Sequence, residues 1–268
     1  MHPSEWLPFL VEIADRADAI ALRFFRAPRL RVETKPDASP VTEADRAIEE
    51  AARALCGARC PALAVAGEEF GIAPEDGGPR LIIDPIDGTR NFVRGVPVFG
   101  TLLAIEEEGE IVAGLVSAPA LASRWSAARG SGAFAGARRI QVSAVRKLED
   151  AFVLHSSVGG RSETAPPPAG FAELVRRVDR TRGFGDFYQH LLVAEGAAEI
   201  AIDPSVRLWD VAALMVIVEE AGGRATTLAG DRRASGGSFV TSNGVLHDAA
   251  LGILSGTRPR LILPDQRT

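Results

Sequence analysis

The chain reads Leu81-Ile82-Ile83-Asp84-Pro85-Ile86-Asp87-Gly88-Thr89-Arg90-Asn91-Phe92 at the point where an aliphatic run breaks into a polar turn. The three aliphatic residues predict a buried strand. Two carboxylates, Asp84 and Asp87, follow it three residues apart. Strands that end in such loops are where open sheets place ligand sites. Hard oxygen donors this close together suit Mg²⁺, although Asp and Gly are also ordinary turn formers.

The composition of the 268-residue chain is that of a globular protein with a substantial core, with 46% hydrophobic and 24% charged residues. The net charge of −5 and the pI near 5.5 give no sign of a nucleic-acid-binding surface. No apolar run reaches the roughly 18 residues that span a bilayer, and the first residues do not resemble a signal peptide. We therefore expect a cytoplasmic protein with no membrane and no nucleic-acid partner.

Two cysteines, Cys56 and Cys60, are too few for a disulfide framework. Together with four dispersed histidines, they also fall short of a zinc site. We expect both cysteines to be free thiols in a reducing compartment.

Hydrophobic periodicity predicts two amphipathic helices in the first half of the chain, over residues 4–25 and from a capped start at Thr42. The polar, proline-bounded stretch 31–40 between them predicts a mobile loop or a distorted hairpin. Residues 98–105 and 111–117, joined by an acidic turn, predict an antiparallel hairpin.

The second half changes rhythm, because predicted helices over 171–178, 187–195 and 209–221 alternate with short strands. We place a boundary near Lys147. It separates an N-terminal α+β lobe, residues 1–146, from a C-terminal α/β lobe, residues 147–268, that completes the active site.

Several motifs in the same chain resemble the inositol monophosphatase family. They are Gly67-Glu68-Glu69, residues 84–92, Trp209-Asp210-Val211-Ala212-Ala213 and Glu220-Ala221-Gly222-Gly223, with Lys35 and Thr42-Glu43-Ala44-Asp45 fitting its N-terminal pattern. The resemblance covers nearly the whole chain in the right order. It implies an α+β fold layered as an αβαβα sandwich, usually a homodimer. It also implies Mg²⁺-dependent, lithium-sensitive hydrolysis of small phosphate monoesters.

Carried over residue by residue, the resemblance implies metal ligands at Glu68, Asp84, Asp87, Asp210 and the backbone carbonyl of Ile86. Asp210 is open to a second interpretation, since an Asp at a helix start is a common cap without any metal. A phosphate monoester is a dianion, so metal ions have to invert the charge of such a pocket. Two or three Mg²⁺ are expected, one lowering the pKa of an attacking water and another stabilising the leaving alkoxide.

The catalytic residues implied are Glu68 and Thr89, near the water, with Asp45 orienting a water or a third metal. Backbone N–H groups of Gly88 and Thr89 are expected to bind phosphate at a helix start. Lys35 is expected to close over the phosphate, with a solvated loop lysine as the alternative.

Three acidic residues are candidates for the alcohol part of the substrate: Asp186, with Asp203 and Glu195 as weaker ones. An acid beside aromatic residues suits a cationic, ring-bearing alcohol, because a desolvated charge needs a counter-charge. Three further segments look like the histidinol-phosphatase branch of the family, namely residues 29–37, Ser117-Ala118-Pro119-Ala120 and Gly183-Phe184-Gly185-Asp186-Phe187.

The expected reaction is therefore hydrolysis of L-histidinol phosphate to L-histidinol and phosphate, in histidine biosynthesis. The alternative is an inositol-1-monophosphatase or a broad sugar-phosphate phosphatase, and a more remote one is a non-catalytic regulatory protein on the same fold. His155 and His190 receive no role, because a lone histidine is more often structural than catalytic.

Overall fold

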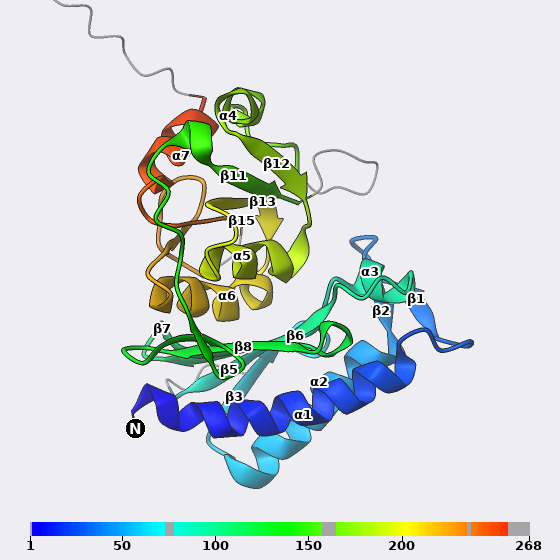
Figure 1. Cartoon of the computed structure of the whole chain (residues 1–268). Helices are drawn as coiled ribbons and strands as arrows, with labels where there is room; N and C mark the ends of the chain where they lie inside the picture. Colours follow the sequence, from blue (N-terminus) through cyan, green and yellow to red (C-terminus); the bar gives the residue numbers. More distant parts are fainter. Residues whose placement is uncertain (1, 73–77, 157–164, 235–236, 257–268) are drawn as a thin grey trace, which may run out of the picture.

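Two helices cover one face of the larger of two main sheets (Figure 1). The computed structural model describes residues 2–72, 78–156, 165–234 and 237–256. Helix α1 spans Leu7–Phe24 after a 3₁₀ turn at Pro3–Trp6, and α2 spans Glu43–Arg59. Both bury an apolar stripe against the sheet, so the two amphipathic helices predicted from periodicity are confirmed.

The larger sheet has eight strands in the order β10-β9-β8-β7-β6-β5-β3-β4, and of these pairs only β3 and β5 run parallel. Its strands are β3 Ala64–Gly67, β4 Gly71–Ile72, β5 Arg80–Asp87, β6 Gly100–Glu107, β7 Glu110–Ala118, β8 Ser123–Ala128, β9 Gly132–Ala135 and β10 Arg138–Ile140. The predicted hairpin is present as β6 and β7. A separate two-stranded sheet pairs β1, Val32–Thr34, with β2, Pro40–Thr42, so the stretch after α1 is a short hairpin.

The second main sheet has five strands in the order β12-β11-β13-β15-β14. They are β11 Phe152–His155, β12 Arg180–Gly183, β13 Ile200–Val206, β14 Arg224–Thr226 and β15 Gly237–Ser242. Helices α4, Phe171–Arg177, and α7, His247–Leu254, cover its outer face (Figure 1). Neither β12 nor α7 was predicted from the sequence.

Helices α5, Asp186–Ala194, and α6, Leu208–Glu220, lie between the two sheets (Figure 1). Every residue of α6 from Val211 to Val218 is buried, because the helix packs on α5, on strands β5 to β9 and on β14 and β15. A helix that is apolar all round belongs in the interior of a layered fold. The predicted α+β sandwich of five αβαβα layers is confirmed.

The division at Lys147 stays a prediction. One core cluster joins Leu102 and Val116 of the larger sheet to Leu191 of α5 and Val216 of α6, so the two segments share an interior. Within the described residues, none of the helices is both long and apolar enough to cross a membrane.

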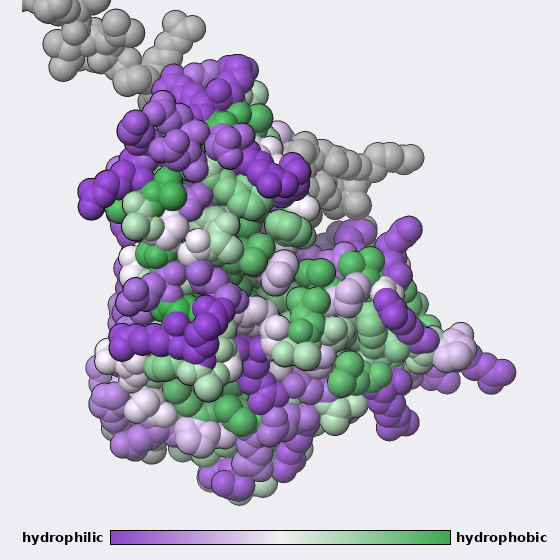
Figure 2. Space-filling view, viewed as in Figure 1, coloured by the Kyte–Doolittle hydropathy of each residue, from purple (hydrophilic) through white to green (hydrophobic). Residues whose placement is uncertain are grey.

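Apolar side chains are also present on the surface. In the view of Figure 2 they gather over the region of α3, Thr89–Val93, bordered by hydrophilic residues. Leu22, Val93 and Val96 have exposed fractions of 49%, 37% and 40%. Arg26, after α1, donates to the Gly95 carbonyl at 2.9 and 3.1 Å, which ties the end of α1 to the loop after α3.

Candidate active site

An irregularity in strand β5 brings the two carboxylates of the opening motif to the edge of the site. The register of β5 against β6 shifts between Asp84 and Asp87, at Pro85, which has no N–H to donate to the ladder. The Pro85 carbonyl accepts a hydrogen bond from Thr101 Oγ1 at 2.8 Å. Strand β5 continues through Pro85 to Asp87. The sequence had predicted a strand that ends after Ile83.

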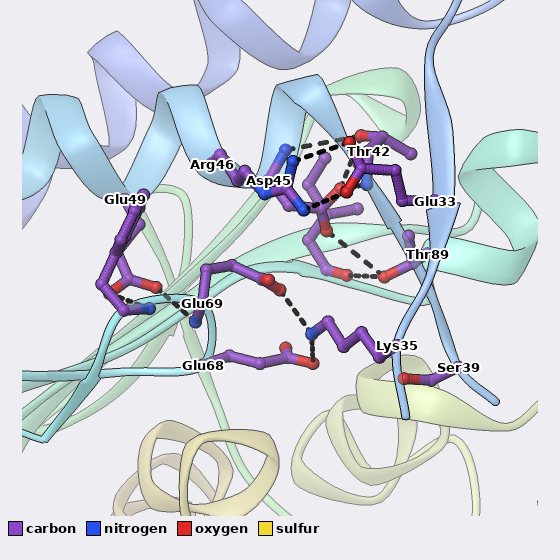
Figure 3. A network of polar contacts seen from close by, with 12 residues as sticks. Glu33, Lys35, Ser39, Thr42, Asp45, Arg46, Glu49, Glu68, Glu69 and Thr89 are labelled. Carbon is purple, nitrogen blue, oxygen red and sulfur yellow. Dashed lines mark hydrogen bonds and ion pairs between the residues drawn. The ribbon is translucent and has the colours of Figure 1, made fainter. Parts of the chain in front are cut away.

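Thr89 connects this strand to helix α2. Its hydroxyl lies 2.9 Å from the Ile86 carbonyl oxygen and 3.4 Å from Asp45 Oδ1 (Figure 3). The other oxygen of Asp45 accepts from the Thr42 N–H at 2.8 Å and from the Thr42 hydroxyl at 2.5 Å, which completes the capping box of α2. The capping box thus holds Asp45 with its second oxygen turned toward Thr89.

The Gly67–Glu69 loop is anchored by a buried carboxylate on α2. Glu49 Oε2 accepts from the Glu69 N–H at 2.8 Å, and Oε1 accepts from the Phe70 N–H at 3.2 Å (Figure 3). A Cβ at Gly67 would lie 2.0 Å from Glu49 Oε1, so only glycine fits there. Glu49 lies one helical turn after Asp45, so a single helix face positions both sides of this part of the site.

Lys35 reaches into the site from the hairpin after α1. Its Nζ lies 2.7 Å from Glu68 Oε1 and 2.6 Å from Glu69 Oε1 (Figure 3). Burial lowers the pKa of Lys35, but the hydrogen bonds to both carboxylates outweigh it and raise the pKa above its ordinary value. The ammonium is therefore a fixed positive charge at the site.

Asp210 has the two features between which the sequence could not decide. Its Oδ2 accepts from the Arg207 N–H at 2.7 Å as part of a capping box at the start of α6. Burial, with the charges of Glu68 and Asp203, raises the pKa of Asp210 to about 7. The residue caps a helix and also belongs to the group of carboxylates.

Mutual repulsion dominates the electrostatics of that group. Burial first, and then the charges of Glu68, Asp87 and Asp210, raise the pKa of Asp84 well above its ordinary value. Burial raises the pKa of Asp45 to about 6, with Glu68 adding to it. Bringing like charges together in a low dielectric is costly unless a cation compensates for them.

Two observations bear on whether the residues fit Mg²⁺. Asp84 Oδ1 is buried and has no hydrogen-bond partner in the described structure, and the donors around it are hard oxygens, which Mg²⁺ prefers. In the described part of the chain, however, no three His, Cys, Asp or Glu side chains form a ready cage for an ion. The donor chemistry fits, and the side chains have to adjust to bind one ion together.

A cavity of about 80 Å³ adjoins the group. It is lined by Asp87, Asp186, Phe187, His190, Asp203, Ser205, Val206, Asp210, Val211 and Leu214. Four of these residues are acidic, and none is lysine or arginine. The composition of this lining favours a cation over an anion.

Asp186 is the first residue of α5, and its backbone conformation is unusual. Asp186 has a φ of 50°, in the left-handed region, and follows Gly185 at 71°. Its Oδ2 accepts from Asn91 Nδ2 at 2.9 Å, and the next N–H, that of Phe187, donates to Asp87 Oδ2 at 2.6 Å. A side chain in this strained conformation is typical of a functional site.

Gly88 caps the five-residue helix α3 with a φ of 81°. A Cβ there would lie 3.0 Å from the Val98 carbonyl oxygen and 3.4 Å from Asp186 Oδ2. The close approach explains the glycine, and the first N–H groups of the helix have no partners within it.

The structure does not bring Glu195 to this cavity, which corrects its place among the substrate contacts. Its Oε1 accepts from Trp125 Nε1 at 2.6 Å, and Oε2 pairs with Arg138. The carboxylate is at the end of α5, where these two partners hold it away from Asp186.

Comparison with known proteins gives a family. The model of the inositol monophosphatase family matches residues 2–257. The chain belongs to the inositol monophosphatase family. A histidinol-phosphatase from Mycobacterium tuberculosis is 49% identical over 250 residues, which cover 91% of this chain and 96% of that protein. A histidinol-phosphatase from Streptomyces coelicolor is 48% identical, covering 91% and 94%.

A solved member of the inositol monophosphatase family has the same architecture. The Thermotoga maritima IMPase is 31% identical and superposes with a TM-score of 0.82, covering 94% of this chain and 97% of that one. The resemblance found in the sequence motifs is confirmed, and so is a phosphatase of this family. The roles of individual residues stay predictions.

The sequence analysis gave no role to two residues that the structure places at this site, His190 and Glu49. His190 lines the cavity, and its position four residues after Asp186 on one helix face is the signal that could have indicated it. Glu49 follows Asp45 at the same spacing, but an acidic residue on a helix gives no sign of being buried.

Proposed function

We propose that this protein is a Mg²⁺-dependent phosphatase that hydrolyses L-histidinol phosphate to L-histidinol and phosphate. The observation that carries the substrate is the cavity beside the carboxylate group. Besides the proposed metal ligands Asp87 and Asp210, its described lining has the acids Asp186 and Asp203 and neither lysine nor arginine. L-Histidinol phosphate brings an ammonium group and an imidazole, which suit a negative cavity, whereas a neutral polyol has no charge to offer. The two histidinol-phosphatase relatives support the same substrate.

The residues that would hold two or three Mg²⁺ are Glu68, Asp84, Asp87, Asp210 and the Ile86 carbonyl. Bound Mg²⁺ would neutralise the phosphate, acidify a water and stabilise the leaving oxygen. The buried, unpartnered Asp84 Oδ1 and the raised pKa values of its neighbours support this set, because a divalent cation relieves both costs.

The chain's own groups supply positioning. Asp45 and Thr89, whose side-chain oxygens lie 3.4 Å apart, would both contact the attacking water and orient it. The N–H groups after Gly88 would bind phosphate oxygens, and Lys35 would add a positive charge from the hairpin. Phosphoryl transfer depends on such positioning and charge neutralisation more than on a protein nucleophile.

This reaction would place the protein in histidine biosynthesis in the cytoplasm. We also propose a homodimer, as expected for the family. The exposed Leu22, Val93 and Val96, near the contact of Arg26 with Gly95, are the apolar side chains that a second copy would cover. Sedimentation of the wild type and of a V96E variant tests this, and a monomeric wild type would contradict it.

The decisive experiment is Mg²⁺-dependent phosphate release, comparing kcat/KM for L-histidinol phosphate and myo-inositol 1-phosphate. We expect a preference of about a hundredfold for histidinol phosphate, roughly 2.7 kcal/mol. Comparable rates would favour the broad inositol or sugar phosphatase and discard the substrate. No Mg²⁺-dependent release from either ester would favour a non-catalytic regulatory role.

A further inference from the structure

Asp203 enters the cavity with one oxygen bound and the other available. Its Oδ2 accepts from Gln189 Nε2 at 2.6 Å and from His190 Nε2 at 3.0 Å. Its Oδ1 accepts no hydrogen bond from the residues that the structure describes. Because a carboxylate oxygen has about two lone pairs, Oδ2 is saturated and Oδ1 is the oxygen left for a ligand.

The imidazole of His190 is held in place through both of its ring nitrogens. The ring is buried, and its Nδ1 lies 2.8 Å from Thr241 Oγ1. Since an ionised carboxylate only accepts, Nε2 carries a proton and donates to Asp203, while Nδ1 is hydrogen-bonded to the Thr241 hydroxyl. Phe239 packs on the ring with centroids 4.8 Å apart. A chain of hydrogen bonds from Thr241 through His190 therefore orients Asp203.

Gln189 supports the same carboxylate at a cost. Its Nε2 also lies 3.3 Å from the Ile202 carbonyl oxygen, while its Oε1 is buried without a partner among the described residues. A buried acceptor without a partner is unfavourable, and this orientation is the one that lets the amide nitrogen of Gln189 donate to Asp203.

We propose that His190 is a positioning residue that, together with Gln189 and Thr241, turns Asp203 Oδ1 toward an ammonium group on the alcohol part of the substrate. The substrate class is a phosphate monoester of an amino alcohol. This inference rests on the proposed function and assigns its amine selectivity to a buried histidine whose hydrogen bonds, among the described residues, are with Asp203, Thr241 and Gln189.

The test uses a matched pair of esters, L-histidinol phosphate and its analogue lacking the amine. We expect H190L to raise KM for the amine ester about tenfold, as loss of an orienting partner does, with little change for the analogue. H190Q, whose amide can replace the Nε2 donor, should recover most of the loss. T241V, which leaves the imidazole in place, should give a smaller loss of the same kind.

H155Q is the matched control, because His155 bonds to the Ser156 carbonyl and lies outside the cavity, and it should change neither KM. Equal losses on both esters would make His190 merely structural and overturn the inference. If H190L does not fold, H190Q and T241V still decide between these outcomes. A wild type with no preference for the amine ester refutes the proposed substrate as well, whereas a preference that no variant alters refutes this inference alone.

Discussion

The acidic residues of the site form two groups. One is the proposed metal group around Asp84, and the other is the proposed amine group of Asp186 and Asp203. The carboxylates of the two groups are held in opposite ways. Asp84, on the larger sheet, has a buried Oδ1 with no partner among the described residues, and burial together with its acidic neighbours raises its pKa. Asp203, on the second sheet, has Oδ2 saturated by two donors. The first group is under electrostatic strain that cations would relieve, so it suits chemistry common to all phosphate monoesters. The second group is ordered in advance, so it suits discrimination between alcohols.

The largest effect is expected in the first group. D84N should lower kcat/KM about a thousandfold, roughly 4 kcal/mol, for every ester alike, because a proposed metal ligand is lost. Calorimetry without metal should show a higher Tm for the variant, since repulsion among the buried carboxylates is removed. D248N, at an exposed side chain, is the control. A loss confined to one ester would break the comparison.

Substitution of Asp186 tests the group of residues proposed to select the alcohol part of the substrate. D186N should raise KM for L-histidinol phosphate about thirtyfold, roughly 2 kcal/mol, because an ammonium loses its counter-charge. The KM for myo-inositol 1-phosphate, whose alcohol part is uncharged, should change less than about threefold. Steady-state kinetics on both esters measure this, and equal effects would remove Asp186 from substrate selection.

His247 is buried and lies in neither group of the site, so we expect its substitution to change stability and not activity. His247 lies between Thr226 Oγ1 and Ser242 Oγ, each 2.8 Å away, and burial lowers its pKa from 6.5 to about 4. A pKa lowered in the folded state means that this stability is present above pH 6.5 and is lost as pH falls toward 4. Denaturant titrations should show that the wild type loses about 2 kcal/mol more than H247Q over that window. H247Q should lack this loss and keep its kcat/KM, and an identical pH slope in both proteins would contradict the assignment.

The smallest effect is expected at Lys35. K35M should raise KM about fivefold, roughly 1 kcal/mol, because a phosphate dianion loses one counter-charge. The increase should be the same for both esters, since Lys35 contacts Glu68 and Glu69 and not the cavity. R46M, which removes an exposed pair with Glu33, should leave KM unchanged. A change in KM that differs between the two esters would contradict this, because it would give Lys35 a part in selecting the alcohol.

Local patterns predicted the elements whose causes are local. The amphipathic stripe of α1 and the Thr42–Asp45 capping box act over a few residues, so spacing alone indicates them. The same holds for the hairpin of β6 and β7. Strand β12 was missed because Arg180–Gly183 is mostly exposed and polar, and only its parallel pairing with β11 makes it a strand.

The sequence by itself determined the family, the fold class and the acidic residues available for a metal, because these depend on residue types at fixed spacings along the chain. Only the tertiary structure decided that Glu195 faces Trp125 and Arg138, and that Glu49 holds the loop carrying Glu68. It also decided that His190 is hydrogen-bonded to Asp203. Each of these contacts joins residues from different elements, and their distance depends on how layers pack, which no local pattern records.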